Sequence, residues 1–570
     1  MHKLGVITAT CQAQCCRFLS LCRHLSTADA SSEMVPIPKA DQLQQTDAYE
    51  ESESRVRKRN LVTSHVLSQC RYRRKPLEVP TVVNTEEIYT NDTQTVTYPH
   101  EHNVCLARVY YANRCQIESA IKSALAAQGA WSLVPASERL HIWRKAADLI
   151  ELEAPYLIAH IVLGLGRTLM DASNDVRRLI STLRSNADYM EHLSLLRFEI
   201  HCDSNVFPKF QLRPMDGIVA AMASFESASM SANLALCPAL MGNTVLWNPA
   251  LEVAPASYLI YQAFKRAGLP KGVINFVPAN ERLFLNTITD ATHFSGLNYH
   301  GDAEKYRYIF KLVGDKMHNF ICFPRLVAEC YGKNFHFVHS SANVKHVCSS
   351  ILEAAFTFAG QNANSLSRIY VPLSMWPELR KRLQESVKSL KMGDPAMPET
   401  QMGPVINREA FTRLKQLIER SINAYKLDFV CGGVCDDTTG YFVQPTIAVV
   451  TDPLSELLSQ PILGPFLPVF VYADDSLNEA LRLAAHQSKY SLSGSIFASK
   501  DEVISHCLTN LRMSASNLYV NERCTGNLRG LTPFGGNRLS GTNDKSGSAY
   551  FLMRWSSPLL IEETINPIER

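Results

Sequence analysis

The chain has 570 residues, of which 46% are hydrophobic, so it is long enough to bury large cores in about two to four structural units. Its 57 Lys and Arg residues nearly balance its 54 Asp and Glu residues, which excludes the charge excess typical of nucleic-acid-binding proteins. No apolar run reaches the roughly eighteen residues that predict a membrane-spanning helix. Small-molecule chemistry is therefore the favoured class of function.

Residues 1–28 are basic, with Lys3, Arg17 and Arg23 but no acidic residue. This composition, without a long apolar stretch, is typical of a mitochondrial transit peptide. The alternative is a basic N-terminus that has no targeting role. The polar residues 29–77 predict a linker with a solvated first helix, and order is expected to begin near "PLEVPTVVN" at residue 76.

Two helices are predicted next. The stretch that follows Asn113, "RCQIESAIKSALAAQGAW", places small and apolar residues on one face at helical spacing, and Asn113 itself is a plausible N-cap. A second helix is predicted over "ERLHIWRKAADLI", from residue 138.

Three apolar runs then predict strands: "GIVAAM" at 217, "NTVLW" at 243 and "GVINFV" at 272. The helical pattern "PASYLIYQAFKRAGLP" lies between the last two and is expected to stop at Gly268. Strand, helix and strand at this spacing predict a βαβ unit and a parallel sheet. Further strands are predicted at "FSGLNYHGD", "KNFHFVH", "RIYVP", "LDFVCGG" and "LPVFVYADD", so two successive α/β domains are expected.

Several common site motifs are absent or incomplete. No G-x-G-x-x-G follows a predicted strand, and "GLG" at 164–166 predicts the end of a helix. His336 and His339 lack the spacing of a metal pair on a helix, and Cys431 and Cys435 form a lone pair, so no metal site is predicted. The sixteen cysteines are scattered, which indicates reduced thiols and no disulfide framework.

Six separated segments resemble motifs of the aldehyde dehydrogenases, in the same order as in that family. They are "FPRLVAECYGKNFHFVH", "GQNANSLSRIYVP", "LKMGDP", "QMGPVI", "LGPFLPVFVYADD" and "PFGGNRLSGTNDKSG". The last segment, together with "HFVHSSANV", resembles the mitochondrial 1-pyrroline-5-carboxylate dehydrogenase branch, which oxidises glutamate 5-semialdehyde in proline catabolism. The resemblance runs from about residue 78 to the C-terminus.

The resemblance implies an α/β aldehyde dehydrogenase fold with a Rossmann-like NAD-binding domain, a catalytic α/β domain and a β-hairpin oligomerisation arm. The expected boundaries are residues 78–325 for the NAD-binding-like domain, with the hairpin near 185–212, and residues 326–524 for the catalytic-like domain. Residues 525–570 are expected to form a loop that anchors the substrate and a segment for oligomerisation.

The family's catalytic positions are altered in this chain. Aligning Gly360 and Gln361 with the family's G-Q-x-C places Ala363 where the nucleophilic cysteine belongs, and a methyl group cannot attack a carbonyl. The family's S-P-F-N reads "ASFE" here, which places Glu226 at the oxyanion-binding asparagine. Glu329 in "AECYGK" matches the family's general base.

The family's cofactor positions are altered as well. Asn248 stands at the lysine of W-K-P that binds the adenosine ribose, and the family's F-T-G-S reads "YHGD", which keeps Gly301 but presents Asp302 to the pyrophosphate. The family's E-E-I-F-G-P reads "QPILGP", with Pro461 and Leu463 at the positions that hold the nicotinamide riboside. NAD binding is therefore expected to be weak or absent.

At the substrate end, the family's S-T-G-S loop reads "CTGN", so that Gly526 remains and Asn527 replaces the serine. An asparagine can still donate a hydrogen bond to a substrate carboxylate. Cys524 and Cys330 lie near these matched positions and are either relocated nucleophiles or inert thiols.

These observations favour a protein of the mitochondrial matrix that keeps the aldehyde dehydrogenase fold, has lost the dehydrogenase reaction and acts through binding or assembly. It is expected to form a homo-oligomer or a hetero-oligomer with an active paralogue. One alternative is an active NAD-dependent enzyme that oxidises glutamate semialdehyde. Another is an enzyme of a different class that uses Cys524 or Cys330.

Overall fold

The computed structural model describes residues 53–72, 75–195, 206–526 and 532–564. The expected transit peptide, residues 1–28, lies outside these ranges. Contacts divide the chain into Met1–Lys58 and one compact unit, Arg59–Arg570, which contains every strand of the described residues. The predicted two α/β halves therefore correspond to two sheets inside one unit.

The first sheet has seven strands in the order β11-β10-β7-β8-β9-β2-β3. The strands from β11 to β9 pair in parallel, and the edge strands β2 and β3 are antiparallel. In chain order the strands are β2 (Thr81–Val83), β3 (Glu86–Ile88), β7 (Ile218–Met222), β8 (Thr244–Asn248), β9 (Ile274–Phe276), β10 (Phe294–Gly301) and β11 (Arg325–Cys330).

Helices bury both faces of this sheet, and its central strands β7, β8, β9 and β10 are buried throughout. In β7, Ile218 and Ala220 pack with residues of α3 and α9, whereas Val219 and Ala221 pack with residues of α4 and α8. The helices in this part of the chain are α3 (Arg114–Leu133), α4 (Ala136–Leu152), α5 (Ala154–Leu165), α6 (Leu169–Leu195), α7 (Ala228–Leu240), α8 (Ala254–Ala267), α9 (Glu281–Thr289), α10 (Ala303–Asp315) and the short 3-10 helix η2 (Met317–Asn319).

Three local predictions are confirmed in this part. Asn113 caps α3 in a capping box with Gln116, and Gly268 ends α8 with a φ of 108°. The "GLG" segment ends α5 at Gly166, whose φ of 71° suits a left-handed helix end.

The second sheet has the order β14-β17-β18-β13-β12-β20-β21, and only its edge strand β14 is antiparallel. Its strands are β12 (Asn334–Val338), β13 (Leu366–Pro372), β14 (Asp428–Cys431), β17 (Thr446–Val449), β18 (Phe466–Tyr472), β20 (Ser493–Phe497) and β21 (Asn517–Val520). The helices of this half are α11 (Val344–Phe356), η3 (Thr357–Gly360), α12 (Trp376–Ser389), α13 (Arg408–Asn423), α14 (Glu456–Ser459), α15 (Leu477–His486) and α16 (Asp501–Leu511).

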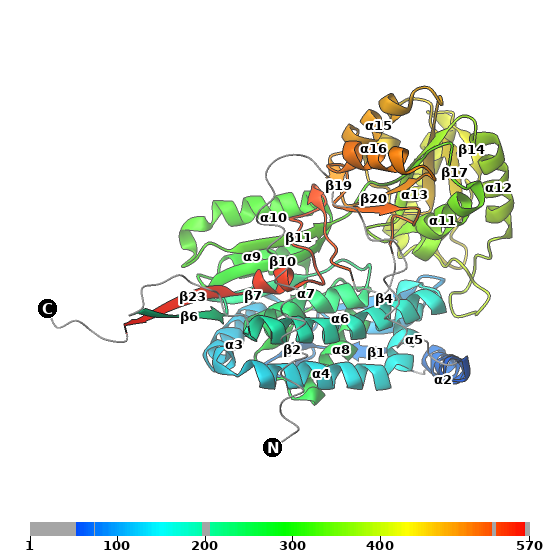
Figure 1. Ribbon diagram of the computed structural model, residues 1–570. Helices are drawn as coiled ribbons and strands as arrows, with labels where there is room; N and C mark the ends of the chain where they lie inside the picture. Colours follow the sequence, from blue (N-terminus) through cyan, green and yellow to red (C-terminus); the bar gives the residue numbers. More distant parts are fainter. Residues whose placement is uncertain (1–52, 73–74, 196–205, 527–531, 565–570) are drawn as a thin grey trace, which may run out of the picture. The chain divides into compact units, whose positions relative to one another are not determined.

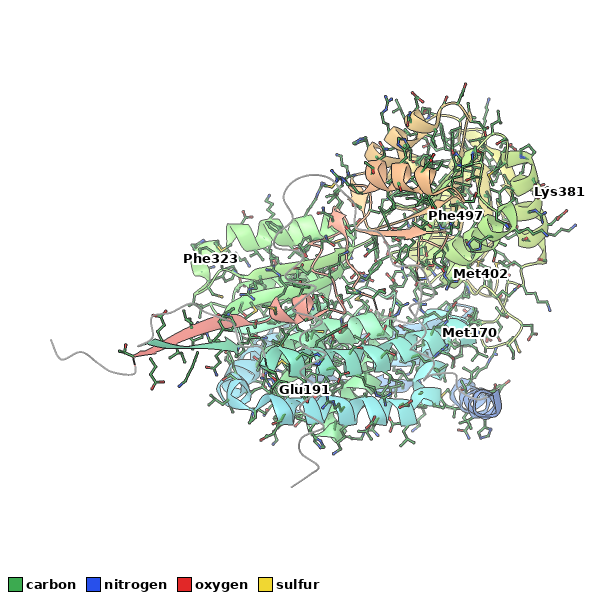
Figure 2. The ribbon with its side chains drawn as sticks, viewed as in Figure 1. Met170, Glu191, Phe323, Lys381, Met402 and Phe497 are labelled. Atoms are coloured by element: carbon green, nitrogen blue, oxygen red, sulfur yellow. The ribbon has the colours of Figure 1, made fainter. Side chains whose placement is uncertain are left out.

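Side chains fill the space between these strands and helices (Figure 2). Met402 and Phe497 are fully buried, whereas Phe323, in the connection before β11, is 86% exposed. Dense apolar packing of this kind supplies the main stabilisation of both halves.

Smaller sheets complete the described structure. They are formed by β1 (Leu77–Val79), β4 (Thr93–Tyr98) and β5 (Glu101–Tyr110), by β15 (Cys435–Asp436) and β16 (Phe442–Val443), by β19 (Tyr490–Ser491) and β22 (Asn537–Arg538), and by β6 (Val206–Arg213) and β23 (Ser557–Thr564). The last pair joins segments far apart in the sequence in one antiparallel ribbon (Figure 1), just after α17 (Ala549–Met553).

Three expectations about these segments need correction. Residues 185–195 belong to α6, not to a hairpin, and the strand that follows, β6, pairs with the C-terminal β23. The helix before residue 77, α2 (Glu53–Arg71), is not fully solvated, because Leu67 and Cys70 are buried. The boundary expected at 325/326 falls at the start of β11, which is a strand of the first sheet.

In the part of the chain that the structure describes, no helix is long and apolar enough to cross a membrane. Within the same residues, no three His, Cys, Asp or Glu side chains form a group that could hold a metal ion. Cys330, Cys431, Cys435 and Cys524 are unpaired thiols.

Candidate functional site

The carboxyl ends of neighbouring strands bring several predicted residues to one edge of the first sheet. Asn248 ends β8, Gly301 ends β10 and Glu329 lies near the end of β11. His300 in β10 and Glu329 in β11 are directly paired in the parallel register. Ligand sites of open parallel sheets form at such an edge.

Glu226 lies in the loop that follows β7, at the same edge. Asp175 on α6 accepts hydrogen bonds from the Ser227 hydroxyl at 2.6 Å, the Ala228 N–H at 2.9 Å and the Ser229 hydroxyl at 2.7 Å. The Arg167 guanidinium donates to the Glu226 carbonyl at 2.5 and 3.2 Å. Buried, charge-assisted hydrogen bonds therefore fix the loop from two sides.

The loop before Ala363 has a strained backbone. Phe358 and Ala359 have φ of 51°, a left-handed conformation that side chains other than glycine rarely adopt. The Arg167 guanidinium lies 3.8 Å from the centre of the Phe358 ring and donates to Asn362 Oδ1 at 2.8 Å. Arg167 thus joins this loop to the Glu226 loop.

Ala363 itself is 3% exposed. Its carbonyl accepts hydrogen bonds from the Gly332 N–H at 3.1 Å and from Asn334 Nδ2 at 2.9 Å, which ties the residue to the connection between β11 and β12. The position is ordered and enclosed, as a reactive residue requires, but it presents only a methyl group.

The Glu329 carboxyl is buried, and burial raises its pKa to about 8, with a further increase from nearby Glu226. Arg178 and Lys545 oppose this increase. Glu329 is consequently mostly protonated at pH 7, and a protonated carboxyl cannot take a proton from water.

Burial also raises the pKa of the two thiols that were considered as nucleophiles, Cys330 and Cys524, well above the usual range. The Cys524 thiol donates to the Asn364 carbonyl at 3.7 Å, and the Cys524 N–H donates to His336 Nε2 at 3.1 Å. Only a thiolate is strongly nucleophilic, so both environments favour inert thiols.

A cleft beside these loops is lined by three arginines, Arg167, Arg178 and Arg523, and by three acidic residues, Asp171, Asp175 and Glu353. Asn364 Nδ2 donates to the Thr525 carbonyl at 3.3 Å, which connects the Ala363 loop to the loop that contains Gly526. Asn527, the other predicted substrate residue, lies outside the described residues. Positive and negative side chains are therefore equal in number in this cleft, and sequence patterns did not indicate it because its residues come from distant segments.

At the positions that the resemblance assigns to the pyrophosphate and the adenosine, the side chains differ in chemistry from the family's NAD-binding residues. Asp302 is the N-cap of α10, and its carboxylate accepts from the Glu304 N–H at 3.1 Å, so the helix end that would attract a phosphate already carries a negative charge. Asn248 is buried, and its Oδ1 accepts from the Ala279 N–H at 3.2 Å. A short amide used in this way cannot replace a lysine that reaches a ribose.

The nicotinamide positions do not fit either. Leu463 has a φ of 50°, and the Arg413 guanidinium donates to the carbonyls of Ile462 and Leu463, the latter at 2.8 Å. The segment is therefore fixed by its backbone, while Pro461 has no side chain that can hydrogen-bond a ribose hydroxyl. This arrangement argues against a bound cofactor at the reacting centre.

Two residues at the centre of the site were missed by sequence reasoning. Ser224 Oγ and His300 Nδ1 are 2.9 Å apart, in a hydrogen bond that links the loop after β7 to the end of β10. Both lie inside the motifs "ASFE" and "YHGD", which differ from the family's S-P-F-N and F-T-G-S at these positions too. These differences from the family motifs were the sequence signal that could have identified Ser224 and His300.

Comparisons with known proteins agree with this fold. A model of the aldehyde dehydrogenase family matches residues 88–558. The mitochondrial delta-1-pyrroline-5-carboxylate dehydrogenase of Homo sapiens is 39% identical over 496 residues, which cover 86% of this chain and 87% of that protein. The Dictyostelium discoideum protein of the same description is 34% identical over 503 residues, 88% of this chain and 90% of that protein.

A solved structure shows the same architecture. The delta-pyrroline-5-carboxylate dehydrogenase of Mycobacterium tuberculosis, crystallised with NAD, superposes with a TM-score of 0.84 at 29% identity and covers 95% of this chain and 98% of its own. The predicted fold is therefore confirmed, and this homologous structure binds NAD.

Proposed function

Since the chain belongs to the aldehyde dehydrogenase family, as a homologue of the delta-1-pyrroline-5-carboxylate dehydrogenases, we propose that it no longer carries out the dehydrogenase reaction and acts through binding or assembly. The observation that carries this proposal is the enclosed, ordered position of Ala363 where the resemblance places the nucleophile.

Three further features support the loss of this reaction. A thioester can form only on a thiol, and the thiols of Cys330 and Cys524 are buried with raised pKa values. Glu226 brings a carboxyl group to the position where the oxyanion would need a donor, and removal of one such donor typically lowers the rate by about 10² to 10³. Glu329 is mostly protonated at pH 7 and has no thioester to hydrolyse.

We expect NAD to bind with a dissociation constant weaker than about 1 mM. Asn248, Asp302 and Pro461 each remove or reverse a cofactor contact, and each loss is worth about 1 to 3 kcal/mol. Titration calorimetry of the purified protein measures this constant directly. The variant Asp302→Ser with Asn248→Lys is the matched comparison and should bind NAD more tightly, whereas a micromolar constant for the unmodified chain would contradict the proposal.

The rival function is NAD-dependent oxidation of glutamate 5-semialdehyde, the activity that the resemblance implies, and the relatives are named delta-1-pyrroline-5-carboxylate dehydrogenases. Retention of Glu329 favours it, whereas retention of the turns "PFGG", "MGPV" and "LGP" beside altered catalytic positions favours a folded protein that acts through binding or assembly. The appearance of NADH with this substrate at a rate above that of the heat-denatured protein would establish the rival. The basic, acid-free residues 1–28 and the mitochondrial relatives support a location in the mitochondrial matrix.

We also expect the chain to self-associate or to join an active paralogue. The ribbon of β6 and β23 leaves Leu560 and Ile561 exposed, and paired strands with free edges and exposed apolar side chains are suited to pairing with a second subunit. Sedimentation should show a dimer or a larger assembly, and Leu560→Asp with Ile561→Asp should weaken it. A monomer at micromolar concentration, with no partner recovered from mitochondria, would contradict this expectation.

A further inference from the structure

The loop after β7 and the end of β10 bring together a serine, a histidine and a glutamate. Ser224 Oγ is 2.9 Å from His300 Nδ1, and His300 Nε2 is 3.4 Å from Glu226 Oε2. Neither Nε2 of His300 nor Oε2 of Glu226 has a hydrogen-bond partner among the described residues. Two buried polar atoms at this separation need a partner, which each can provide to the other or which a water or a ligand can supply.

The exposure of the three residues is graded. His300 is 1% exposed and Glu226 is 8% exposed, whereas Ser224 is only partly buried. Ser224 is therefore the most exposed of the three residues. The His300 imidazole and the Glu226 carboxyl are shielded from water. Their electrostatic interaction is stronger in this buried environment than it would be in water.

The surroundings set the proton positions. Burial lowers the pKa of His300, although Glu226 opposes this shift, so the imidazole is neutral at pH 7 and can accept a proton. The Tyr331 ring lies 6.0 Å from the His300 ring, and burial raises the pKa of its phenol. Glu329, which is paired with His300 across the strands, is itself mostly protonated at pH 7, so it adds little negative charge.

We propose that Ser224, His300 and Glu226 form a site for serine-dependent cleavage of carboxylic esters. Ser224 is the nucleophile, His300 is the general base and Glu226 is a positioning residue that accepts from the His300 Nε2–H. This is the arrangement in which a nucleophile and a base lie within hydrogen-bond reach and a third group orients the base. The 3.4 Å separation is of the looser kind that occurs in such groups before substrate binds.

The reaction balances without an oxidant, a reductant or a cofactor. Ser224 Oγ forms a bond to the ester carbonyl carbon while its proton passes to His300 Nδ1. The bond from that carbon to the alcohol oxygen breaks, and the departing alcohol takes the proton from Nδ1. Water then attacks the acyl carbon and gives its proton to Nδ1, and Ser224 leaves with that proton, which yields a carboxylic acid and the free enzyme.

The loop is built to hold the nucleophile in place. Asp175 fixes the residues that follow Glu226, and Arg167 fixes the Glu226 carbonyl. All three members of the group stand at positions where "ASFE" and "YHGD" differ from the family motifs. Three separate differences that bring a hydroxyl, an imidazole and a carboxyl together are the reason to assign this group a function of its own, one that does not depend on loss of the dehydrogenase.

The test uses the full chain with 4-nitrophenyl acetate and, separately, with a serine-directed fluorophosphonate. We expect turnover of the ester, and we expect mass spectrometry to find the phosphonate on Ser224. Ser224→Ala should lower turnover by at least about 10²-fold and abolish labelling. Glu226→Gln should lower kcat with little change in KM, because the carboxylate acts through the histidine.

Ser341→Ala is the matched control. The Ser341 hydroxyl and His339 Nδ1 are also 2.9 Å apart, but no carboxylate of the described residues lies within ion-pair distance of His339, so turnover should be unchanged. Equal turnover by Ser224→Ala and the unmodified chain, or labelling of other residues only, would overturn the proposal. Because the labelled residue is identified on the unmodified chain, that part of the test does not depend on whether any variant folds.

Discussion

Ala363→Cys alone is expected to leave NAD reduction with glutamate semialdehyde at the level of the unmodified protein. The new thiol would occupy an enclosed position with 3% exposure, and the oxyanion of its adduct would face Glu226 instead of an amide donor. Hydride transfer also needs a positioned nicotinamide, and the cofactor residues do not fit one. When catalytic residues act as a unit, restoring one of them recovers little of the reaction rate.

A combined variant is expected to regain turnover. It joins Ala363→Cys to changes at the oxyanion and cofactor positions, namely Glu226→Asn, Asn248→Lys, Asp302→Ser, Pro461→Glu and Leu463→Phe. The control carries the same five changes but keeps Ala363, and it should bind NAD without reducing it. Formation of NADH is followed by absorbance. Sustained NAD reduction by Ala363→Cys alone would show that the cofactor site had been functional throughout.

Asp175→Ala is expected to lower the free energy of unfolding by about 3 to 5 kcal/mol. Asp175 belongs to α6, and its buried carboxylate contacts the start of α7. It accepts three hydrogen bonds there, from two hydroxyls and a backbone N–H. Its removal leaves those donors unpaired in the interior and removes a negative charge from the positive end of the helix. Denaturation with urea, followed by circular dichroism, measures the change.

Asp188→Ala is the matched control on the same helix. Asp188 is exposed and pairs with Arg144 at 3.0 Å, and an exposed ion pair contributes about 0 to 1 kcal/mol. If both variants lose the same small amount of stability, the Asp175 hydrogen bonds are not what fixes the loop. Esterase turnover should fall in Asp175→Ala as well, because the loop contains Ser224.

Local sequence patterns correctly predicted strands and helices whose structure depends mainly on their own apolar periodicity and end residues. The run of strand, helix and strand between residues 243 and 277 became β8, α8 and β9, because alternating apolar runs and a terminal glycine at 268 specify such a unit. The hairpin expected near 185–212 came from the resemblance instead. The helical spacing of buried residues such as Leu179, Leu183 and Met190 on α6 was the better guide.

The candidate site was predicted only in part, because its residues meet through the order of strands in the sheet. Ser224 follows β7 and His300 lies in β10, and these strands are neighbours although β8 and β9 come between them in the chain. No local pattern reveals that adjacency. Arg167, which joins the loops of Glu226 and Ala363, comes from a third segment, and no local pattern predicted its role either.

The contact between His300 and Glu226 has a consequence for substitutions at these two positions. A buried imidazole or carboxyl that loses its partner costs about 1 to 3 kcal/mol. The effects of replacing the two side chains are therefore expected to be non-additive, because residues in contact are energetically coupled. Replacing one of them alone should lower the free energy of unfolding more than replacing both together.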